Sequence, residues 1–303
     1  MSEEIRKPAV AGYFYPANKD ELIKLIENCF KHPLGPGKLP KEITPRNSYR
    51  IIAAQVPHAG YIYSGPCAAW AYLELYIDGK PDTIVILGPN HTGLGLPVSV
   101  WPRGYWETPL GRLEIDKEVV DILLQHEVFA SDYSAHVQEH SIEVQLPFVQ
   151  YIFGNDVKIV PICIADPRLE TAEEISKGIL HAIAETKKRI LILASSDMTH
   201  YEPQDVAQMK DSEALDAIIS LDVKKLYELV ESGLTMCGFA PVSVAMLVAS
   251  HFKAGGHVVK YYTSGDIIGD ISSVVGYASV VFEKGIPIKK PKKPIKEEIT
   301  PSI

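Results

Sequence analysis

The 303-residue sequence predicts an α/β fold in which a central mixed, mainly parallel sheet is flanked by helices on both faces. Apolar runs of strand length, at residues 50–56, 82–88 and 189–194, alternate with longer segments of helical apolar spacing. Strands and helices interleave throughout, without an internal repeat. We therefore expect one domain over residues 1–285, followed by a Lys/Pro-rich tail over residues 286–303.

The individual elements follow from the same spacing. A sequence resembling a capping box, Asn18 to Glu21, precedes a helix whose apolar stripe runs from Leu22 to Phe30. Glycine and proline then predict a loop over residues 31–47. Pro147 must either kink its helix or lie in the first turn. Beyond the three strands above, we predict helices over 66–76, 115–127, 140–153, 169–187, 205–219, 222–232 and 240–252, and strands over 96–101, 157–164, 257–262 and 272–282, the last running antiparallel.

Composition excludes several classes of protein. A net charge of −8, with its only dense basic run at 289–293 in the tail, argues against a nucleic-acid partner. No stretch approaches the ~18 apolar residues of a membrane helix, and the first residues do not resemble a signal peptide. The four cysteines show no CxxC pattern or disulfide-like rhythm, which is typical of a reducing compartment. We expect a cytoplasmic protein that uses neither nucleic acid nor membrane.

Three histidines, His58, His91 and His200, lie just after predicted buried strands. In open α/β sheets, ligands bind in the crevice outside the carboxyl ends of the strands. The pattern therefore predicts one shared pocket lined by imidazoles, and imidazole is the commonest metal ligand among side chains. For one such histidine alone, a loop imidazole bonded to a nearby carbonyl is the simpler interpretation, but the matching settings of His58 and His91 weaken it.

Cys237 comes shortly before the helix predicted over 240–252. A helix amino end lowers the pKa of a nearby thiol, and the thiolate is the form that binds metal or attacks carbon. The alternative is a small buried hydrophobe. That alternative suits the other three cysteines, whereas the glycine beside Cys237 and the nearby Thr235 favour a functional thiol.

Two further clusters carry groups for acid–base chemistry. Asp197 and His200 would share a face if their segment opens a helical turn, and the carboxylate would then hold the tautomer of the imidazole. The alternative is an N-cap aspartate beside a surface histidine. His136, His140 and Glu143 form a weaker cluster, because their order and spacing differ from a zinc-binding HExxH helix.

Taken together, these segments resemble the Memo family. The resemblance spans nearly all of the chain except the lysine-rich tail. It is carried by Arg6–Pro16, Pro57–Tyr61, Gly88–His91, Glu139–Phe148, Ser195–His200 and Cys237–Gly238.

The resemblance implies a fold similar to class III extradiol dioxygenases, which bind Fe(II) through two histidines and a carboxylate. It assigns the histidine ligands to His58 and His91 and the acid–base position to His200. The third ligand position holds Cys237, and a thiolate there favours copper(I), zinc or a thiolate-bound iron. Dioxygenase activity itself is then not expected. The resemblance also implies a radical-SAM protein as a pathway partner, and peptide recognition in eukaryotic members.

Three hypotheses follow. The leading one is a metal-binding, redox-related protein that holds Fe(II) or Cu(I), with zinc as a further candidate, through His58, His91 and Cys237. Its catalytic groups would be His200, Asp197 and His140. The second is a metal-independent thiol enzyme with Cys237 as nucleophile, His200 as base and Asp197 as orienting group. The third is a non-catalytic module that binds a peptide or small molecule.

Overall fold

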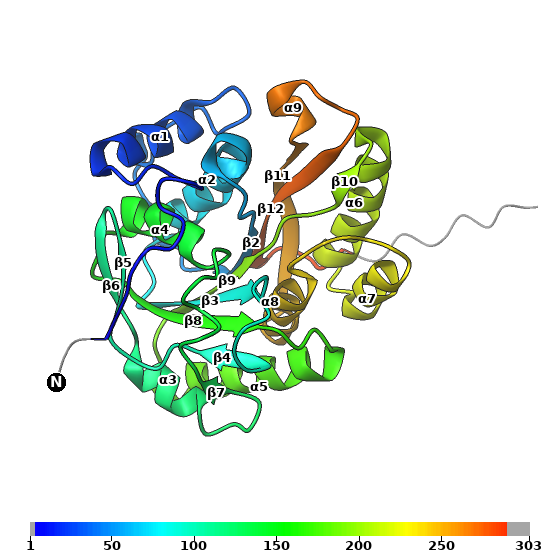
Figure 1. The fold of residues 1–303 in the computed structure, drawn as a ribbon. Coiled ribbons are helices and arrows are strands. Elements are labelled where there is room, and N and C mark those ends of the chain that lie inside the picture. Colours follow the sequence, from blue (N-terminus) through cyan, green and yellow to red (C-terminus); the bar gives the residue numbers. More distant parts are fainter. Residues whose placement is uncertain (1–3, 290–303) are drawn as a thin grey trace, which may run out of the picture.

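A mixed sheet forms the centre of the molecule in the computed structural model, which describes residues 4–289 (Figure 1). Most of the predicted tail, 286–303, lies outside the described residues. Within them the sheet has nine strands. In spatial order these are β10 (His200–Glu202), β12 (Val274–Lys284), β2 (Ile51–Val56), β9 (Ile190–Ser195), β3 (Thr83–Pro89), β8 (Lys158–Ile164), β4 (Val98–Val100) and β7 (Ala130–Ser131), while β11 (Ala254–Thr263) pairs with β12.

The four central strands, β2, β9, β3 and β8, are parallel, and antiparallel strands adjoin them on both sides. Every residue of β2, β3 and β9 is buried, as expected for strands covered on both faces. Because these three strands run in one direction, the segments that follow them emerge at one edge of the sheet. The predicted mixed α/β sheet, with its last long strand antiparallel, is confirmed.

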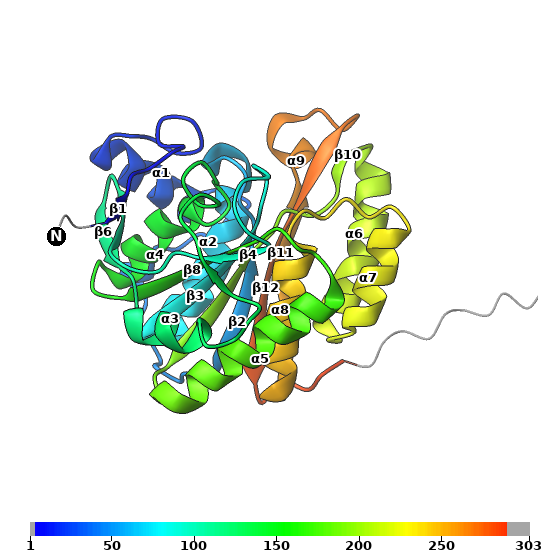
Figure 2. The same ribbon diagram turned by 60° about the horizontal axis from the view of Figure 1, so that its bottom comes forward.

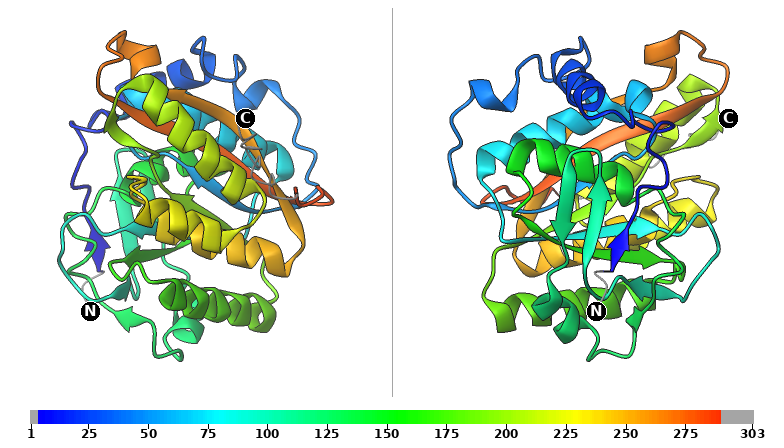
Figure 3. Two further views of the ribbon diagram at one scale, coloured as in Figure 1. Left: turned by 90° about the vertical axis from the view of Figure 1, so that its right-hand side faces the viewer. Right: turned by 60° about the vertical axis from the view of Figure 1, so that its left-hand side comes forward.

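Helices cover both faces of this sheet. On one side, α2 (Tyr61–Asp78) packs on β2 and β12, and α1 (Lys19–Lys31) and α4 (Leu146–Phe153) pack against α2. On the other side, α8 (Phe239–His251) packs on β2, β9 and β3, and α5 (Leu169–Thr186) packs against α8 (Figures 1 and 2). Figure 3, left, looks onto α6 and α7, which extend this second layer. Among the described residues, no helix has both the length and the apolarity needed to cross a membrane. The helices are α1 (Lys19–Lys31), α2 (Tyr61–Asp78), α3 (Lys117–Leu123), α4 (Leu146–Phe153), α5 (Leu169–Thr186), α6 (Gln204–Ile219), α7 (Val223–Glu231), α8 (Phe239–His251) and α9 (Gly265–Ile268), with 3-10 turns at Pro40–Glu42 and Glu143–Gln145.

The helix predicted over 140–153 is wrong in its first half. Residues 140–142 are not helical, and α4 begins at Leu146, with Pro147 in its first turn, one of the two predicted alternatives. The reason is local competition for the backbone: the N–H of Ser141 donates to the Glu139 carboxylate at 3.0 Å instead of entering a helix. This irregular stretch becomes part of the site described below.

A second, three-stranded sheet is not predicted by the sequence pattern. The N-terminal strand β1 (Ile5–Arg6) pairs in parallel with β5 (Tyr105–Thr108), which forms a hairpin with β6 (Gly111–Glu114). Figure 3, right, shows β1 lying beside that hairpin. A two-residue strand is too short to show an alternating apolar pattern, so only its tertiary contacts define it. This small sheet fixes the start of the chain to the body of the domain.

Candidate metal centre

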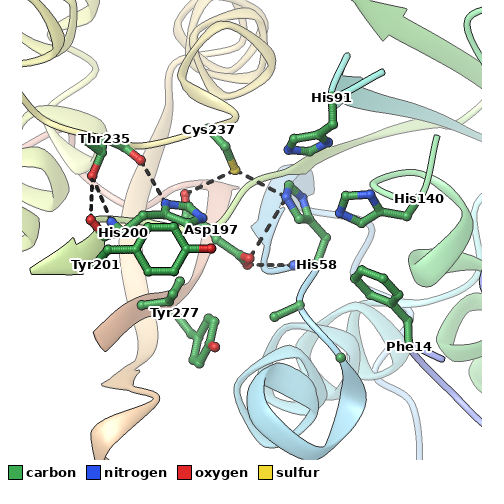
Figure 4. Close-up of a pocket in the computed structure, with 13 residues that line it drawn as sticks. Phe14, His58, His91, His140, Asp197, His200, Tyr201, Thr235, Cys237 and Tyr277 are labelled. Carbon is green, nitrogen blue, oxygen red and sulfur yellow. Dashed lines mark hydrogen bonds and ion pairs between the residues drawn. The ribbon is translucent and has the colours of Figure 1, made fainter. Parts of the chain in front are cut away.

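A cavity of about 480 Å³ opens at the carboxyl ends of β2, β3 and β9. It brings together segments from seven regions of the chain. Figure 4 shows His58, His91 and His140 on one side, His200, Tyr201 and Thr235 on the other, and Asp197 and Cys237 between them. The cavity is lined by Phe14, His58, Ala59, Gly60, His91, His140, Asp197, His200, Tyr201, Thr235, Cys237, Val275 and Tyr277.

Three imidazoles form the densest group in this cavity. One ligand nitrogen from each of His58, His91 and His140 lies within 4.8 Å of the other two, and we call these residues the three-imidazole group. The rings of His91 and His140 stack at 4.6 Å, and His58 meets both edge-on, at 5.2 and 5.3 Å. This spacing allows one ion to be reached by all three rings.

Buried hydrogen bonds fix the tautomer of His58. The Ser195 hydroxyl donates to the carbonyl of Ser141 at 2.6 Å and accepts from the Gln145 amide at 2.8 Å. Its single proton is thus used, so the 2.9 Å contact with Nδ1 of His58 requires the imidazole to donate. Nε2 of His58 therefore presents a lone pair to the cavity, as a metal ligand must.

His91 is held by a buried carboxylate in the same way. Glu139 accepts the backbone N–H of His91 at 2.6 Å and faces its Nδ1 at 2.8 Å. Burial raises the pKa of Glu139, but the hydrogen bonds from His91 and Ser141 and the charge of His91 outweigh it and lower the pKa to about 2. The carboxylate is ionised at neutral pH and accepts the Nδ1 proton, so in the neutral imidazole the lone pair of His91 lies on Nε2. This is the carboxylate–histidine arrangement common behind metal ligands.

His140 completes the group from the irregular segment before α4. Its Nδ1 lies 3.5 Å from the Glu139 carboxylate, and Phe14 packs on its ring at 4.6 Å. Burial lowers the pKa of His140 to about 4 and takes the pKa of His58 well below its usual range. Both imidazoles are therefore neutral at pH 7, and the neutral ring is the form that binds metal.

Glu143, which sequence spacing placed beside His140, faces the other way. Its buried carboxylate binds Arg6, the backbone N–H groups of Ala9 and Val10, and the hydroxyl of Tyr15. The expected helical pairing with His140 is wrong because that stretch is not helical. His136 is also remote from the cavity, since its buried ring bonds the carbonyl of Ser99 at 3.0 Å.

Glu139 is a residue of the candidate site that sequence reasoning missed. Reading His140 and Glu143 at helical spacing drew attention away from the carboxylate immediately before His140. The available signal was a glutamate next to a histidine in a segment that also resembles the Memo family.

Cys237 lies beside the three-imidazole group. Its Sγ is 3.2 Å from Nε2 of His58, but it falls outside the set of mutually close ligand atoms. The thiol precedes Gly238, the N-cap of α8. Burial, reinforced by the charge of Asp197, raises the pKa of the Cys237 thiol, so the predicted lowering by the helix amino end is wrong. The loss of solvation outweighs the helix dipole at this depth, and a bound cation is the natural means of stabilising the thiolate.

Asp197 and His200 do not share a helical face. The segment leaves β9 in extended form, and His200 begins β10, opposite Val275 of β12. Asp197 instead accepts the backbone N–H of His58 at 2.8 Å, and burial raises its pKa to about 6. It therefore positions the loop that carries His58.

His200 belongs to the opposite wall of the cavity, which we define as His200, Tyr201 and Thr235. Its Nδ1 donates to the carbonyl of Thr235 at 2.9 Å, and its backbone N–H donates to the Thr235 hydroxyl. Nε2 of His200 is therefore available as a proton acceptor. The Cys–His–Asp order expected for a thiol enzyme is not formed, because His58, rather than His200, is the imidazole bonded to Cys237.

Comparison with solved structures gives the fold class of the chain. A solved structure of an uncharacterized protein from Escherichia coli K12 superposes with a TM-score of 0.51 and covers 77% of this chain and 99% of its own. At 13% identity it shows the fold alone, a mixed α/β sheet flanked by helices on both faces.

Sequence comparison then gives the family. The model described as "Memo-like protein" matches residues 6–281, and the chain belongs to the Memo family. A MEMO1 family protein of Sulfurisphaera tokodaii is 51% identical, over 92% of this chain and 99% of its own length. Those of Ignicoccus hospitalis and Methanopyrus kandleri are 49% and 47% identical, each over 92% of this chain and 98% and 99% of their own lengths.

Proposed function

We propose that the cavity binds one transition-metal ion, iron(II) or copper(I), with zinc as a further candidate. The observation that carries this proposal is the convergence of three imidazole nitrogens within 4.8 Å at the carboxyl ends of buried strands. The fixed tautomers of His58 and His91, both with Nε2 free, support it. So does burial, which keeps the pKa of His58 and of His140 below the physiological range.

In this proposal His58 and His91 are ligands for any of these metals, and Cys237 completes the set. His140 is in a position to bind as well. A thiolate favours copper(I), whereas additional imidazole nitrogen suits iron(II) and zinc equally. The pocket therefore offers a soft donor, the Cys237 thiolate, on one side of His58 and a harder donor, the His140 imidazole, on the other.

The other residues have roles that do not depend on the metal's identity. When bound, iron(II) or copper(I) supplies redox chemistry or polarises a ligand oxygen. Nε2 of His200 accepts a proton from a bound small molecule, and Asp197 positions the His58 loop. Phe14 and Tyr277 give the cavity apolar walls. We infer a redox-related role, with turnover resting on His200.

The test is anaerobic titration of chelator-stripped protein with Fe(II) and, separately, with Cu(I). The unmodified protein is expected to bind about one equivalent of metal. His58→Ala and Cys237→Ser are expected to lose stoichiometric binding, and His181→Ala, on the outer face of α5, is the matched control. Retained binding in both pocket variants contradicts the proposal.

His140→Ala separates the two ligand sets. If it weakens Fe(II) binding more than Cys237→Ser does, while Cys237→Ser weakens Cu(I) binding more, the two metals differ in which third ligand contributes most. If His140→Ala changes neither titration, His140 is not a metal ligand, and the catalytic role that the sequence predicts for it becomes the remaining candidate.

A second candidate function is capture of a small molecule or peptide without turnover. It is favoured by the exposure of Tyr201, whose side chain is 78% exposed at the cavity mouth. Incubating the iron-loaded protein with a metabolite mixture separates the two functions: turnover yields new products, and capture yields only retained compounds.

A further inference from the structure

Arg6 is a buried arginine that the proposed function leaves without a role. Its side chain is 1% exposed, and the guanidinium stacks on the ring of Trp106 at 4.4 Å. It lies in β1, more than 130 residues before the histidine segment it contacts. Burying an arginine is costly, so its hydrogen-bond partners must account for its position.

Those partners belong to the irregular segment that carries Glu139 and His140. Nε and Nη2 of Arg6 donate to the carbonyl of His136 at 3.1 and 2.9 Å, and Nη2 donates to the carbonyl of Glu139 at 2.8 Å. Nη1 donates to the carboxylate of Glu143. One guanidinium thus spans residues 136–143. It is a second donor to the carbonyl of His136, which also accepts the backbone N–H of Glu139 at 3.3 Å, and it satisfies the buried carbonyl of Glu139.

The same contacts attach the N-terminal segment to the site. The Glu143 carboxylate that receives Arg6 also accepts the backbone N–H groups of Ala9 and Val10, at 2.8 and 3.0 Å. Four residues further on, Phe14 packs on the His140 ring. Residues 5–15, which we call the N-terminal strap, are therefore one wall of the three-imidazole group.

We propose that Arg6 is a positioning residue for the metal site, acting through the backbone of Glu139 on the orientation of His91 and His140. The inference rests on the proposed metal-binding function. Glu139 holds His91 through two hydrogen bonds, so a shift of its main chain moves the carboxylate and the imidazole together. Substituting groups that orient metal ligands typically costs 10- to 100-fold in metal affinity.

Lysine at position 6 cannot reproduce the arrangement. A guanidinium presents five donors in a rigid plane, and Arg6 uses all three of its nitrogens, on three carbonyls and a carboxylate. An ammonium carries the charge towards Glu143 but lacks the planar fork. Charge and geometry can therefore be tested separately.

The experiment uses Co(II), whose visible absorption reports the number and geometry of its ligands. Arg6→Ala and Arg6→Lys are each expected to bind Co(II) at least tenfold more weakly than the unmodified protein, with an altered spectrum. Arg103→Ala is the matched control, because Arg103 ties the same N-terminal segment through Glu4 at 2.6 Å without contacting residues 136–143. It is expected to bind within threefold of the unmodified protein.

Chemical rescue distinguishes positioning from general destabilisation. Guanidinium chloride at about 20 mM, far below the molar concentrations that unfold proteins, is expected to restore most of the affinity and the spectrum of Arg6→Ala, whereas equal sodium chloride restores neither. Unchanged Co(II) affinity in folded Arg6→Ala and Arg6→Lys contradicts the inference. Failure of the unmodified protein to bind Co(II), Fe(II) or Cu(I) instead contradicts the proposed function.

A measurement on the unmodified protein decides the matter if neither variant folds. Coupling between two sites is reciprocal, so metal binding must stabilise the strap that positions its ligands. Adding Co(II) is expected to slow amide hydrogen exchange at Ala9 and Val10 together with residues 136–143. Protection confined to the loops of His58 and His91 contradicts the role of Arg6.

Discussion

The two walls of the cavity differ in how firmly hydrogen bonds hold their side chains. The imidazoles of His58 and His91 are each fixed by a hydrogen-bonded group buried behind the ring, Ser195 or Glu139. The opposite wall depends on Thr235, an exposed loop residue, and ends in Tyr201, which is itself mostly exposed. A wall held rigidly by buried hydrogen-bonding groups suits a resident ion, whereas a wall held by exposed loop residues suits a ligand that enters and leaves.

Removing a ligand from the rigid wall is expected to have the largest effect. His91→Ala deletes an imidazole whose tautomer is already set, and should weaken Fe(II) binding at least a hundredfold. His200→Ala removes an imidazole of the opposite wall and should leave affinity within threefold. Chelator competition measures both. Equal losses in the two variants would show that the walls are not functionally distinct.

Neutralising the carboxylate behind His91 tests orientation rather than ligation. Glu139→Gln keeps the shape but removes the charge that holds the Nδ1 proton, and metal affinity should fall ten- to a hundredfold. Thr235→Val is the counterpart on the opposite wall, where it removes the hydroxyl bonded to His200. Its metal affinity should equal that of the unmodified protein, and a comparable loss there would contradict the comparison.

Adjacent serines sharpen the contrast further. Ser195→Ala leaves the Nδ1–H of His58 without an acceptor, which should cost about 1–3 kcal/mol of stability and several-fold in metal affinity. Ser196 bonds the N–H of Gly238 at 3.0 Å and hydrogen-bonds the Cys237 thiol, but it does not touch the three-imidazole group. Ser196→Ala should therefore leave the imidazoles in place and reduce metal affinity less than Ser195→Ala does. Thermal unfolding and chelator competition measure the two quantities.

The smallest expected effect is on the pH dependence of the metal-free protein. Burial lowers the pKa of His140 to about 4, so the unfolded chain binds a proton before the folded one as pH falls below about 6.5. The free energy of unfolding therefore decreases as the pH falls from about 6.5 towards 4. The loss is up to about 1 kcal/mol over the first pH unit below 6.5. The pKa of Asp197 is raised to about 6 in the folded protein, so protonation of this carboxyl increases the free energy of unfolding as the pH falls below that value.

The variant His140→Asn isolates this contribution because it leaves Asp197 unchanged. Denaturant unfolding between pH 6.5 and 5.5 should give a shallower loss of stability for His140→Asn than for the unmodified protein. An identical slope in the two proteins would mean that the ring is solvated in solution.

Sequence predicts those features of the structure that depend on where the strands lie along the chain. Largely apolar runs identify β2, β3 and β9. The rule that ligands bind at the carboxyl ends of strands then brings His58, His91 and His200 to one cavity. This rule depends only on the position of each histidine after its strand, whatever residues flank it. The fold and the location of the site therefore follow from local pattern.

The parts that sequence does not predict depend on buried long-range contacts. Glu139 and Ser195 act on imidazoles 48 and 137 residues away, and Arg6 acts across 130 or more. Helical spacing wrongly paired His140 with Glu143, because side chains compete for the backbone there. No periodicity records such bonds, so the groups that orient the ligands emerge only from the packed structure.

Elemental analysis of protein purified without affinity metals tests the central claim most directly, with the His58→Ala variant prepared in parallel. About one equivalent of iron or copper per chain is expected in the unmodified protein, or after anaerobic loading, and less than a tenth of that in His58→Ala. Metal at equal levels in both preparations, or none in either after loading, would contradict a metal centre built on the three-imidazole group.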